Sequence, residues 1–350
     1  MGMTSRVYRR IAASLDLCVE ASPIRSTTEG DLVIEQLPPT DEQRRQRFRG
    51  ALLGTAIGDA LGAPFEGATH VSRQALRWRL EHPGQMTWTD DTHMTIGLAE
   101  SLIACGSFVG AHMARHFADR YRAEPWRGYG AGPPQIFAAL AQGAAWNEAA
   151  RSLFNGSGSY GNGAAMRVAP IGLLASHDLK VVADFARQSA CITHAHACGV
   201  DGAVMQACAV GLLTDHATNQ PPDRMQLIEA IRPHLCSDAF HNALDELLHL
   251  PVDADPEQVV ARLGHGIEAV HSVPTALFAF LRSPHDFADT VLFAISLGGD
   301  ADTIGAMAGA LAGAYLGQQG IPSIWRAEVE ASRHLVELAD RLFDLVAANH

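Results

Sequence analysis

The sequence predicts an all-α protein whose glycine-rich loops converge on an acidic site. Apolar residues recur at helical spacing along most of the 350-residue chain, and 47% of the residues are hydrophobic, enough to bury a large core. Strand signals are few, and the only convincing apolar β-like run, 291–297, is diluted by small residues. Glycines 50, 54, 58 and 62 recur every four residues and form a smooth stripe against which a second helix can pack closely.

The composition excludes several classes of protein. A formal charge of -12 argues against nucleic-acid binding, because such proteins usually carry a basic patch. The one dense basic run, Arg44–Arg49, opens a predicted helix and is interpreted as a solvated or interface face. No apolar run reaches the ~18 residues of a membrane span. The six cysteines form no zinc-like pairs, and the first residues lack a signal-like apolar region, so we expect reduced thiols in a cytoplasmic protein.

The first part of the chain differs from the rest. Residues 1–46 are expected to form an N-terminal extension or arm, and residues 47–350 the main domain. A short helix is predicted at 5–20, followed by a polar, turn-rich stretch that ends at Pro38-Pro39. Thr40 and Gln43 have the spacing of a capping box and predict the start of a helix that runs through the glycine stripe to Gly62.

Further helices are indicated by apolar periodicity between glycine, proline and aspartate punctuation. In order, they are expected at 94–104, 135–143, from 164, at 199–214, at 264–281 with a break at Pro274, at 304–317 and at 322–348, with two or three more between 222 and 264.

Two acidic stretches carry the candidate chemistry. One is SLGGDADTIG at 296–305, and the other is WTDDT at 88–92. Mg²⁺ prefers oxygen ligands of this kind and is usually held by a few carboxylates while it keeps positions open for substrate. Asp and Thr are also good helix N-caps, so each stretch can be explained as a cap. The residues alone favour the two interpretations equally.

Two glycine-rich loops, 127–134 and 155–163, precede predicted helices. Backbone N–H groups of the second loop, with the helix start expected at 164, can hold an anion such as phosphate. The loop is not a GxxxxGK[ST] nucleotide loop, because no lysine completes it. His194, ahead of the helix 199–214, is on its own more typical of a structural side chain.

The stretch Asp300–Thr303 invites comparison with the DxDx[TV] motif of aspartyl-phosphate phosphatases. That family holds the phosphoryl group with a downstream basic residue, usually lysine, whereas Lys180 is the only lysine of this chain. Its motif also ends the first strand of a parallel sheet, and here the stretch lies late in a helical chain. This interpretation is therefore disfavoured.

Five motifs follow one another along the chain: GALLGTAIGDALGAPFEG at 50–67, WTDDT at 88–92, GSYGNGAAMR at 158–167, ITH at 192–194 and SLGGDADTIG at 296–305. Together they closely resemble the ADP-ribosylglycohydrolase family in order and separation, over roughly residues 47–345. The resemblance implies a compact all-α domain with two Mg²⁺ (or Mn²⁺) ions in a cleft. It favours the metal site over the pair of caps.

The resemblance also implies roles for single residues. The first ion would be held by Thr89, Asp90 and Asp91, and the second by Asp300, Asp302 and Thr303, with Asp302 bridging. Glu66 matches a mobile glutamate near the metals, and either Glu66 or Asp91 is the candidate general acid or base. The residues that match the diphosphate loops are Gly128, Gly132, Gly158, Ser159, Tyr160 and Asn162. Phe154 and His194 match the adenosine and ribose pocket, and Val273 matches an apolar contact to the adenine.

The leaving group and the arm are less constrained. Family members release ADP-ribose from arginine, from serine or from small metabolites. The loop GSYGNG looks more like the serine-directed branch, but most bacterial-type relatives act on arginine, so arginine on a modified protein is the favoured substrate and the others are alternatives. A binding-only protein is disfavoured, because all the acidic ligands are present. Residues 1–46 depart from the family, either as a packing extension or, as in immunity proteins, as an arm that blocks a cognate ADP-ribosyltransferase toxin through the segment 33–37.

Overall fold

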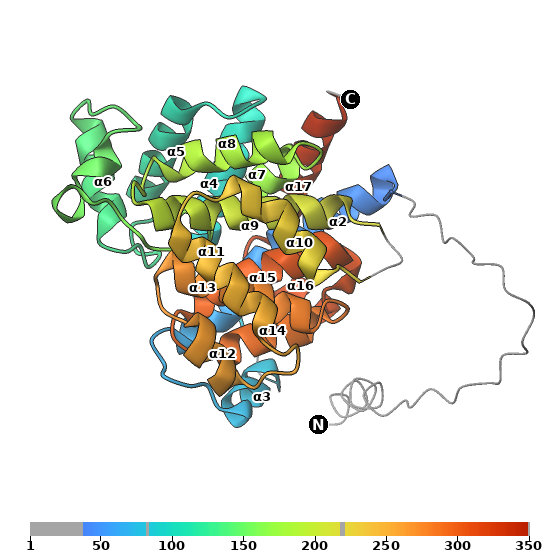
Figure 1. Cartoon of the computed structure of the whole chain (residues 1–350). Coiled ribbons are helices and arrows are strands. Elements are labelled where there is room, and N and C mark those ends of the chain that lie inside the picture. Colours follow the sequence, from blue (N-terminus) through green and yellow to red (C-terminus); the bar gives the residue numbers. More distant parts are fainter. Residues whose placement is uncertain (1–37, 82–83, 218–220, 349–350) are drawn as a thin grey trace, which may run out of the picture. The chain divides into compact units, whose positions relative to one another are not determined.

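The computed structural model describes residues 38–81, 84–217 and 221–348, and this part of the chain is built from helices (Figure 1). Apart from two isolated β-bridges, the described ranges contain no strand, so the predicted all-α class is confirmed. The first eight helices are α2 Asp41–Gly62, α3 Arg73–Glu81, α4 Asp90–Cys105, α5 Gly110–Ala123, α6 Gly132–Ala141, α7 Ala169–Leu174, α8 Leu179–Ala190 and α9 Ala197–Asp215. The others are α10 Arg224–Ile231, α11 Asp238–His249, α12 Pro256–Leu263, α13 Ala269–Arg282, α14 Phe287–Ser296, α15 Ala301–Leu316, α16 Ser323–Glu328 and α17 Ser332–Ala347.

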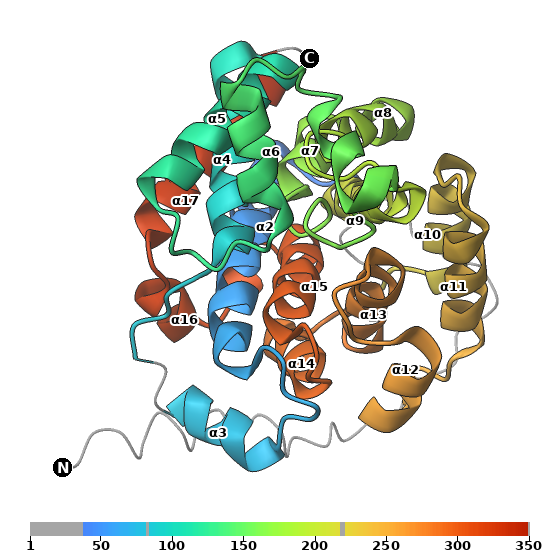
Figure 2. The ribbon, with the colours of Figure 1, turned by 90° about the vertical axis from the view of Figure 1, so that its left-hand side faces the viewer.

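Helices α2 and α15 lie side by side in antiparallel directions and form the central pair of the domain (Figure 2). The predicted capping box starts α2, because the Thr40 hydroxyl accepts the N–H of Gln43 at 3.3 Å and the Gln43 side chain accepts the N–H of Thr40 at 2.8 Å. The glycine stripe faces α15 as predicted. A Cβ added to Gly58 would lie only 1.9 Å from the carbonyl oxygen of Gly305, so the two backbones are in direct contact.

Helix α9 packs against α7, α8, α13 and α15. By length and composition its 19 residues are apolar enough to cross a membrane, which the sequence analysis did not recognise. However, 78% of the apolar 18-residue stretch of this helix is buried inside the protein, as expected for a core helix.

The β-like signal at 291–297 gives no strand, and one expected helix differs from the structure. The β-like run 291–297 belongs mostly to helix α14, where Phe287, Val291 and Ile295 are buried at four-residue spacing and so share one helical face. The long helix expected at 322–348 is interrupted between α16 and α17. There the segment around Val329 leaves the helix to form a parallel bridge with Met86, and Ala331 takes a positive φ of 56°.

The basic run at the start of α2 is not a solvated face. Arg49 donates two hydrogen bonds to the Asp340 carboxylate at 2.6 and 2.8 Å, and Arg45 pairs with Asp344 at 2.6 Å, so both fasten α2 to α17. Arg47 is buried and donates to the carbonyl oxygens of Leu213, Thr214 and His216. The run therefore holds the start of α2 to α17 and to the end of α9.

Three further expectations concern segment boundaries. Residues 163–167 form turns rather than a helix, and α7 begins only at Ala169. Helix α13 continues through Pro274 without a break. The expected helix 5–20 and the arm segment 33–37 lie outside the described residues, so the toxin-blocking arm stays a prediction.

Candidate metal and substrate site

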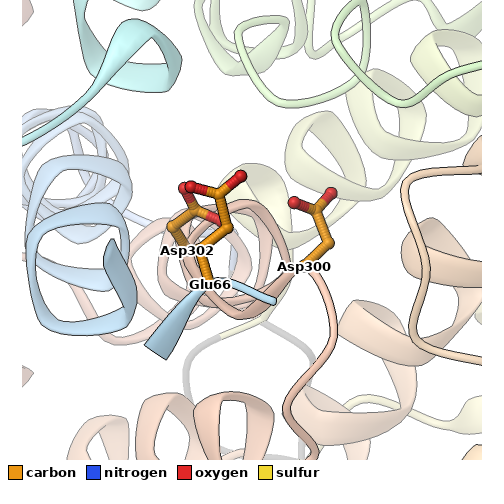
Figure 3. A group of neighbouring side chains, drawn as sticks. All are labelled: Glu66, Asp300 and Asp302. Carbon is orange, nitrogen blue, oxygen red and sulfur yellow. The ribbon is translucent and has the colours of Figure 1, made fainter. Parts of the chain in front are cut away.

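Three carboxylates from two distant parts of the chain meet at one end of the central helix pair. One oxygen each from Glu66, Asp300 and Asp302 lies within 4.8 Å of the others, a geometry that can hold a metal ion (Figure 3). Asp300 and Asp302 are buried, whereas Glu66 is exposed. The acidic cluster at 300–302 is thus brought to Glu66, as the resemblance implied.

Backbone pairing holds these carboxylates together. The N–H of Gly67 donates to the carbonyl oxygen of Gly299 at 2.8 Å, and the N–H of Gly299 donates to that of Ala68 at 2.7 Å. Gly299 has a φ of 65°, and a Cβ there would lie 2.0 Å from the carbonyl oxygen of His265. Only glycine fits this position, which explains the Gly-Gly pair ahead of Asp300.

The second acidic cluster opens helix α4 and is held by a buried carboxylate, Asp59 on α2. Asp59 is fully buried and accepts hydrogen bonds from the N–H of Thr89 at 2.9 Å, the N–H of Thr92 at 3.0 Å and the Thr92 hydroxyl at 2.6 Å. It thereby satisfies the free N–H groups at the start of α4. The backbone that carries Thr89, Asp90 and Asp91 is fixed by this one side chain.

Burial and mutual repulsion strongly perturb the carboxylates of the site. Burial, with Asp300 and Glu66 nearby, raises the pKa of Asp302 to about 9, and burial with Asp59 nearby raises the pKa of Asp90 to about 7. Burial and the charge of Asp59 also raise the pKa of Asp91 well above its usual range. The pKa of Glu66 is raised by burial and by Asp300.

The carboxylates fit a divalent cation. In the described part of the chain none of them forms an ion pair, and Oδ1 of Asp91 is buried without a hydrogen-bond partner. A buried, unpartnered carboxylate oxygen among like charges is costly unless a cation neutralises it. Among the described residues, Glu66, Asp300 and Asp302 are the carboxylates that bring one oxygen each within 4.8 Å of the others. Asp90 and Asp91 lie outside this group. The charges of Asp300 and Glu66 nevertheless raise the pKa of Asp90, and those of Asp300 and Asp302 raise the pKa of Asp91.

Replacing Asp59 with asparagine is expected to weaken Mg²⁺ binding about 10- to 100-fold, since residues that orient metal ligands typically contribute this much. The control is Asp201→Asn on α9. Asp201 is equally buried and accepts the N–H groups of Cys236 and Ser237 at the start of α11, away from the acidic group. Both variants should lower the melting temperature, but only Asp59→Asn should reduce the rise in melting temperature that Mg²⁺ produces. Equal Mg²⁺ responses would contradict the orienting role.

The glycine-rich loops lie beside the carboxylates of the site. Gly128 has a φ of 91°, and a Cβ there would be 3.7 Å from Oδ1 of Asp90. Gly158 packs against Ala195 and the N–H of His196 with no room for a side chain. Because residues 163–167 are turns, no helix N-terminus follows the second loop, and its anion-binding capacity rests on the loop's own N–H groups.

Asn162 joins the second loop directly to the acidic group. Its amide donates to the Asp300 carboxylate and, at 3.0 Å, to the hydroxyl of Ser272. The loop is also paired with the segment before α13, since the N–H of Asn162 donates to the carbonyl oxygen of Ile267 at 2.9 Å. In this structure Asn162 therefore orients a metal-ligand candidate, a role that the resemblance did not suggest.

His194 is buried at the same loop and is held by its neighbours. Its Nδ1 lies 2.8 Å from the hydroxyl of Thr193, which accepts a hydrogen bond from the fully buried Arg167. Burial and the nearby Arg167 charge lower the pKa of His194 to about 3, so the ring is neutral. Arg167 also donates to the carbonyl oxygen of Gly163 at 2.8 Å and so fixes the end of the loop.

The predicted adenine contact, Val273, is 0% exposed in this structure and packs towards Gly202 inside the core. Its contact with adenine stays a prediction. The exposed apolar side chain of that segment is Ile267, at 61%. Phe154 is exposed at 57% with a positive φ of 51°, and Gly132 opens α6 next to Leu153. Their roles in ligand binding stay predictions, as do those of Ser159, Tyr160 and Thr303.

Sequence reasoning missed three residues that build the site. In the sequence analysis Asp59 and Arg167 appear only as letters of two motifs, at 50–67 and 158–167. Arg127 was seen as part of a glycine-rich loop, although it organises the contacts around Trp88 described below. For Arg127 and Arg167, the one signal in the sequence was the position of a charged residue beside a glycine-rich loop.

An all-helical frame that carries a buried carboxylate group and glycine-rich loops has the features of an enzyme that uses divalent metal ions on an anionic substrate. The model of the family described as ADP-ribosylglycohydrolase matches residues 40–350. The chain belongs to the ADP-ribosylglycohydrolase family and is an ADP-ribosyl glycohydrolase.

Curated relatives and a solved structure agree with this assignment. ADP-ribosylhydrolase ARH3 of Mus musculus is 38% identical over 337 residues, which cover 85% of this chain and 90% of that protein. ADP-ribosylarginine hydrolase Tri1 of Pseudomonas putida (strain GB-1) is 29% identical over 328 residues, covering 87% of this chain and 80% of that protein. A solved structure titled ADP-ribosylglycohydrolase-related protein complex matches with a TM-score of 0.70 at 26% identity, covering 87% of this chain and 99% of that one.

Proposed function

We propose that the chain hydrolyses the bond between mono-ADP-ribose and a modified protein side chain. The observation that carries the proposal is the group of Glu66, Asp300 and Asp302, together with the unpartnered Oδ1 of Asp91, which suits divalent cations next to the glycine-rich loops. Two ions, Mg²⁺ or Mn²⁺, would be held by Thr89, Asp90, Asp91, Asp300, Asp302 and Thr303.

When bound, such ions orient the ribose hydroxyls and lower the pKa of a bound water. Residues of the chain itself position the metal-ligand candidates. Asp59 fixes the start of α4, and Asn162 fixes Asp300. The N–H groups of the glycine loops bind the diphosphate without a positive side chain, which explains how a chain of formal charge -12 binds an anion.

We assign the general acid or base to Glu66 rather than Asp91. A group that exchanges a proton in each turnover needs a path to water, and Glu66 is exposed whereas Asp91 is 2% exposed. Asp91 then acts as a ligand only.

The cleaved bond is proposed to be O-linked, with arginine as the second candidate. The relative whose name specifies arginine is 29% identical, whereas the ARH3 proteins of mouse and human are 38% identical. The loop 158–163 also resembles the serine-directed branch of the family. This proposal replaces the expectation of arginine from the sequence alone. A cognate toxin as a further partner of residues 1–46 has no support in the described residues.

Release of ADP-ribose from serine-modified and arginine-modified proteins, with Mg²⁺ and with EDTA, tests this function. We expect release from the serine-modified protein to fall by more than about 100-fold with EDTA, because activation of water by the ions accounts for several kcal/mol of the barrier. Release that is insensitive to the chelator would contradict the metal role. Release only from arginine would restore the second candidate, and no release from either would leave a binding protein.

A further inference from the structure

A groove of about 450 Å³ lies beside the start of α4. Two of its lining residues, Thr89 and Gly128, are next to Asp90. Its other lining residues are Gln85, Thr87, Trp88, Trp126, Arg127 and Glu330. The groove therefore borders both the metal-ligand candidates of α4 and the segment that precedes α4.

One edge of this extended segment is open to pairing. Met86 pairs with the segment around Val329, because its N–H donates to Glu328 at 3.2 Å and its carbonyl accepts from Glu330 at 3.0 Å. Successive residues of an extended chain point their backbone groups to opposite sides, so those of Thr87 face away from this partner. Thr87 is exposed, and within the described residues its N–H and C=O make no hydrogen bond.

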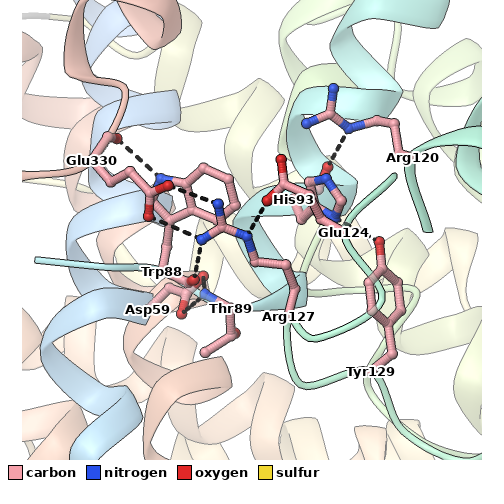
Figure 4. A network of polar contacts seen from close by, with 9 residues as sticks. All are labelled: Asp59, Trp88, Thr89, His93, Arg120, Glu124, Arg127, Tyr129 and Glu330. Carbon is pink, nitrogen blue, oxygen red and sulfur yellow. Dashed lines mark hydrogen bonds and ion pairs between the residues drawn. The ribbon is translucent and has the colours of Figure 1, made fainter. Parts of the chain in front are cut away.

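The floor of the groove is held by several contacts of one side chain, Arg127 (Figure 4). Its guanidinium donates two hydrogen bonds to Glu330 at 2.7 and 2.9 Å, one to Glu124 at 2.6 Å and one to the carbonyl of Trp88 at 3.2 Å. It also lies 3.8 Å from the centre of the Trp88 ring, whose Nε1 donates to the Glu330 carbonyl at 3.0 Å. This network joins the groove walls into one preformed surface.

One wall of the groove ends in an exposed aromatic side chain. Trp126 is 72% exposed, the highest value among the large hydrophobic side chains of the described residues. It sits one residue before Arg127, so its backbone is fixed while its ring remains open to a partner. Tryptophan is enriched among the residues that contribute most to protein–protein binding, so an exposed tryptophan beside a preformed groove can anchor a polypeptide.

We propose that this groove binds the polypeptide that carries the ADP-ribose, as an extended segment next to the modified residue. The proposal rests on the proposed function, since Thr89 belongs both to the groove and to the metal-ligand candidates, and the modified side chain must reach the latter. The N–H and C=O of Thr87 pair with the backbone of the segment, and Trp126 packs on its side chains. Backbone pairing is independent of sequence, so the groove favours modified polypeptides over ADP-ribosyl metabolites.

The test compares two substrates that carry the same linkage. One is a singly ADP-ribosylated peptide of about seven residues, long enough to lie along the groove as a strand. The other is the ADP-ribosylated free amino acid, serine or arginine, whichever linkage the enzyme cleaves. The variants are Trp126→Ala and Thr87→Pro. Proline removes the N–H of Thr87, and the preceding Met86 is already extended, as a residue before proline must be.

We expect wild-type kcat/KM to be higher for the peptide, and each variant to lower the peptide value about 5- to 10-fold, the usual effect of losing an aromatic anchor or a backbone pair. The value for the free amino acid should change less than about twofold. Ile324→Ala, which truncates another exposed apolar side chain on α16, should change neither.

Equal kcat/KM for peptide and amino acid in the wild type would overturn the groove proposal and leave the hydrolase function intact. An equal loss on both substrates in the variants would place the nucleotide end of the ligand in the groove and would also overturn it. Release of ADP-ribose from neither substrate would instead reject the hydrolase function on which the groove rests.

Discussion

Asp302→Asn is expected to lower ADP-ribose release by about 10³-fold or more, because the carboxylate at the centre of the acidic group is lost. Asp302 lies with Glu66 and Asp300 within 4.8 Å, and its charge also raises the pKa of Asp91 in the other cluster. Asp302, like Asp300 at the N-cap of α15, therefore acts on both clusters. Asparagine keeps the size and an oxygen for the N–H of Thr303, which now donates to Oδ1 at 2.9 Å.

The same variant should be more stable than the wild type in EDTA. Burial among like charges raises the pKa of the wild-type carboxyl to about 9, so at neutral pH this group must take up a proton when the metal-free protein folds. Asparagine is neutral in both states and avoids this cost. Thermal unfolding with and without Mg²⁺ measures this stability. The increase in melting temperature that Mg²⁺ produces should be smaller in the variant than in the wild type. Asp340→Asn on α17 removes an equal charge from the ion pairs with α2 and should leave release and the Mg²⁺ response unchanged. Release within tenfold of the wild type would contradict the central role of Asp302.

Local signals in the sequence were sufficient for much of the fold. The capping box at Thr40 and the four-residue glycine spacing depend only on neighbours along one helix, and both predictions are confirmed. The run 291–297 was ambiguous, because a short apolar run fits a buried helix and a strand equally well. The break near Val329 depends on pairing with Met86, more than 200 positions away, and no local pattern marks it.

The site was predictable where residue type carries the chemistry. Carboxylates in tight clusters fitted a metal site and helix caps equally, and the resemblance favoured the metal site. The structure brings Glu66 to Asp300 and Asp302. Asp59 was not recognised, because its role comes from the position of α4 relative to α2. The burial of Val273 was not foreseen, because its position was taken from the resemblance, whereas its burial is set by the packing of α13 on α9.

The central helix pair links fold to function. Glycines on α2 face α15 in antiparallel order, with Gly50 against Gly313, Gly54 against Gly309 and Gly58 against Gly305. Beyond them, a Cβ on Gly62 would lie 2.5 Å from the Cα of Asp302. The close approach of the two backbones therefore sets the distance between the end of α2, which leads to Glu66, and the start of α15, which carries Asp302.

Gly58→Ala is expected to destabilise the protein by about 3–5 kcal/mol or to prevent folding, because the new methyl group meets backbone rather than a movable side chain. Its Cβ would lie 1.9 Å from the Gly305 carbonyl oxygen and 2.3 Å from the carbonyl carbon. The control is Gly130→Ala, where no atom lies within 4 Å of the added Cβ. Urea unfolding of both variants measures the effect. If Gly58→Ala folds with the stability of Gly130→Ala, the helices can separate at little cost, and their contact does not fix the geometry of the acidic group.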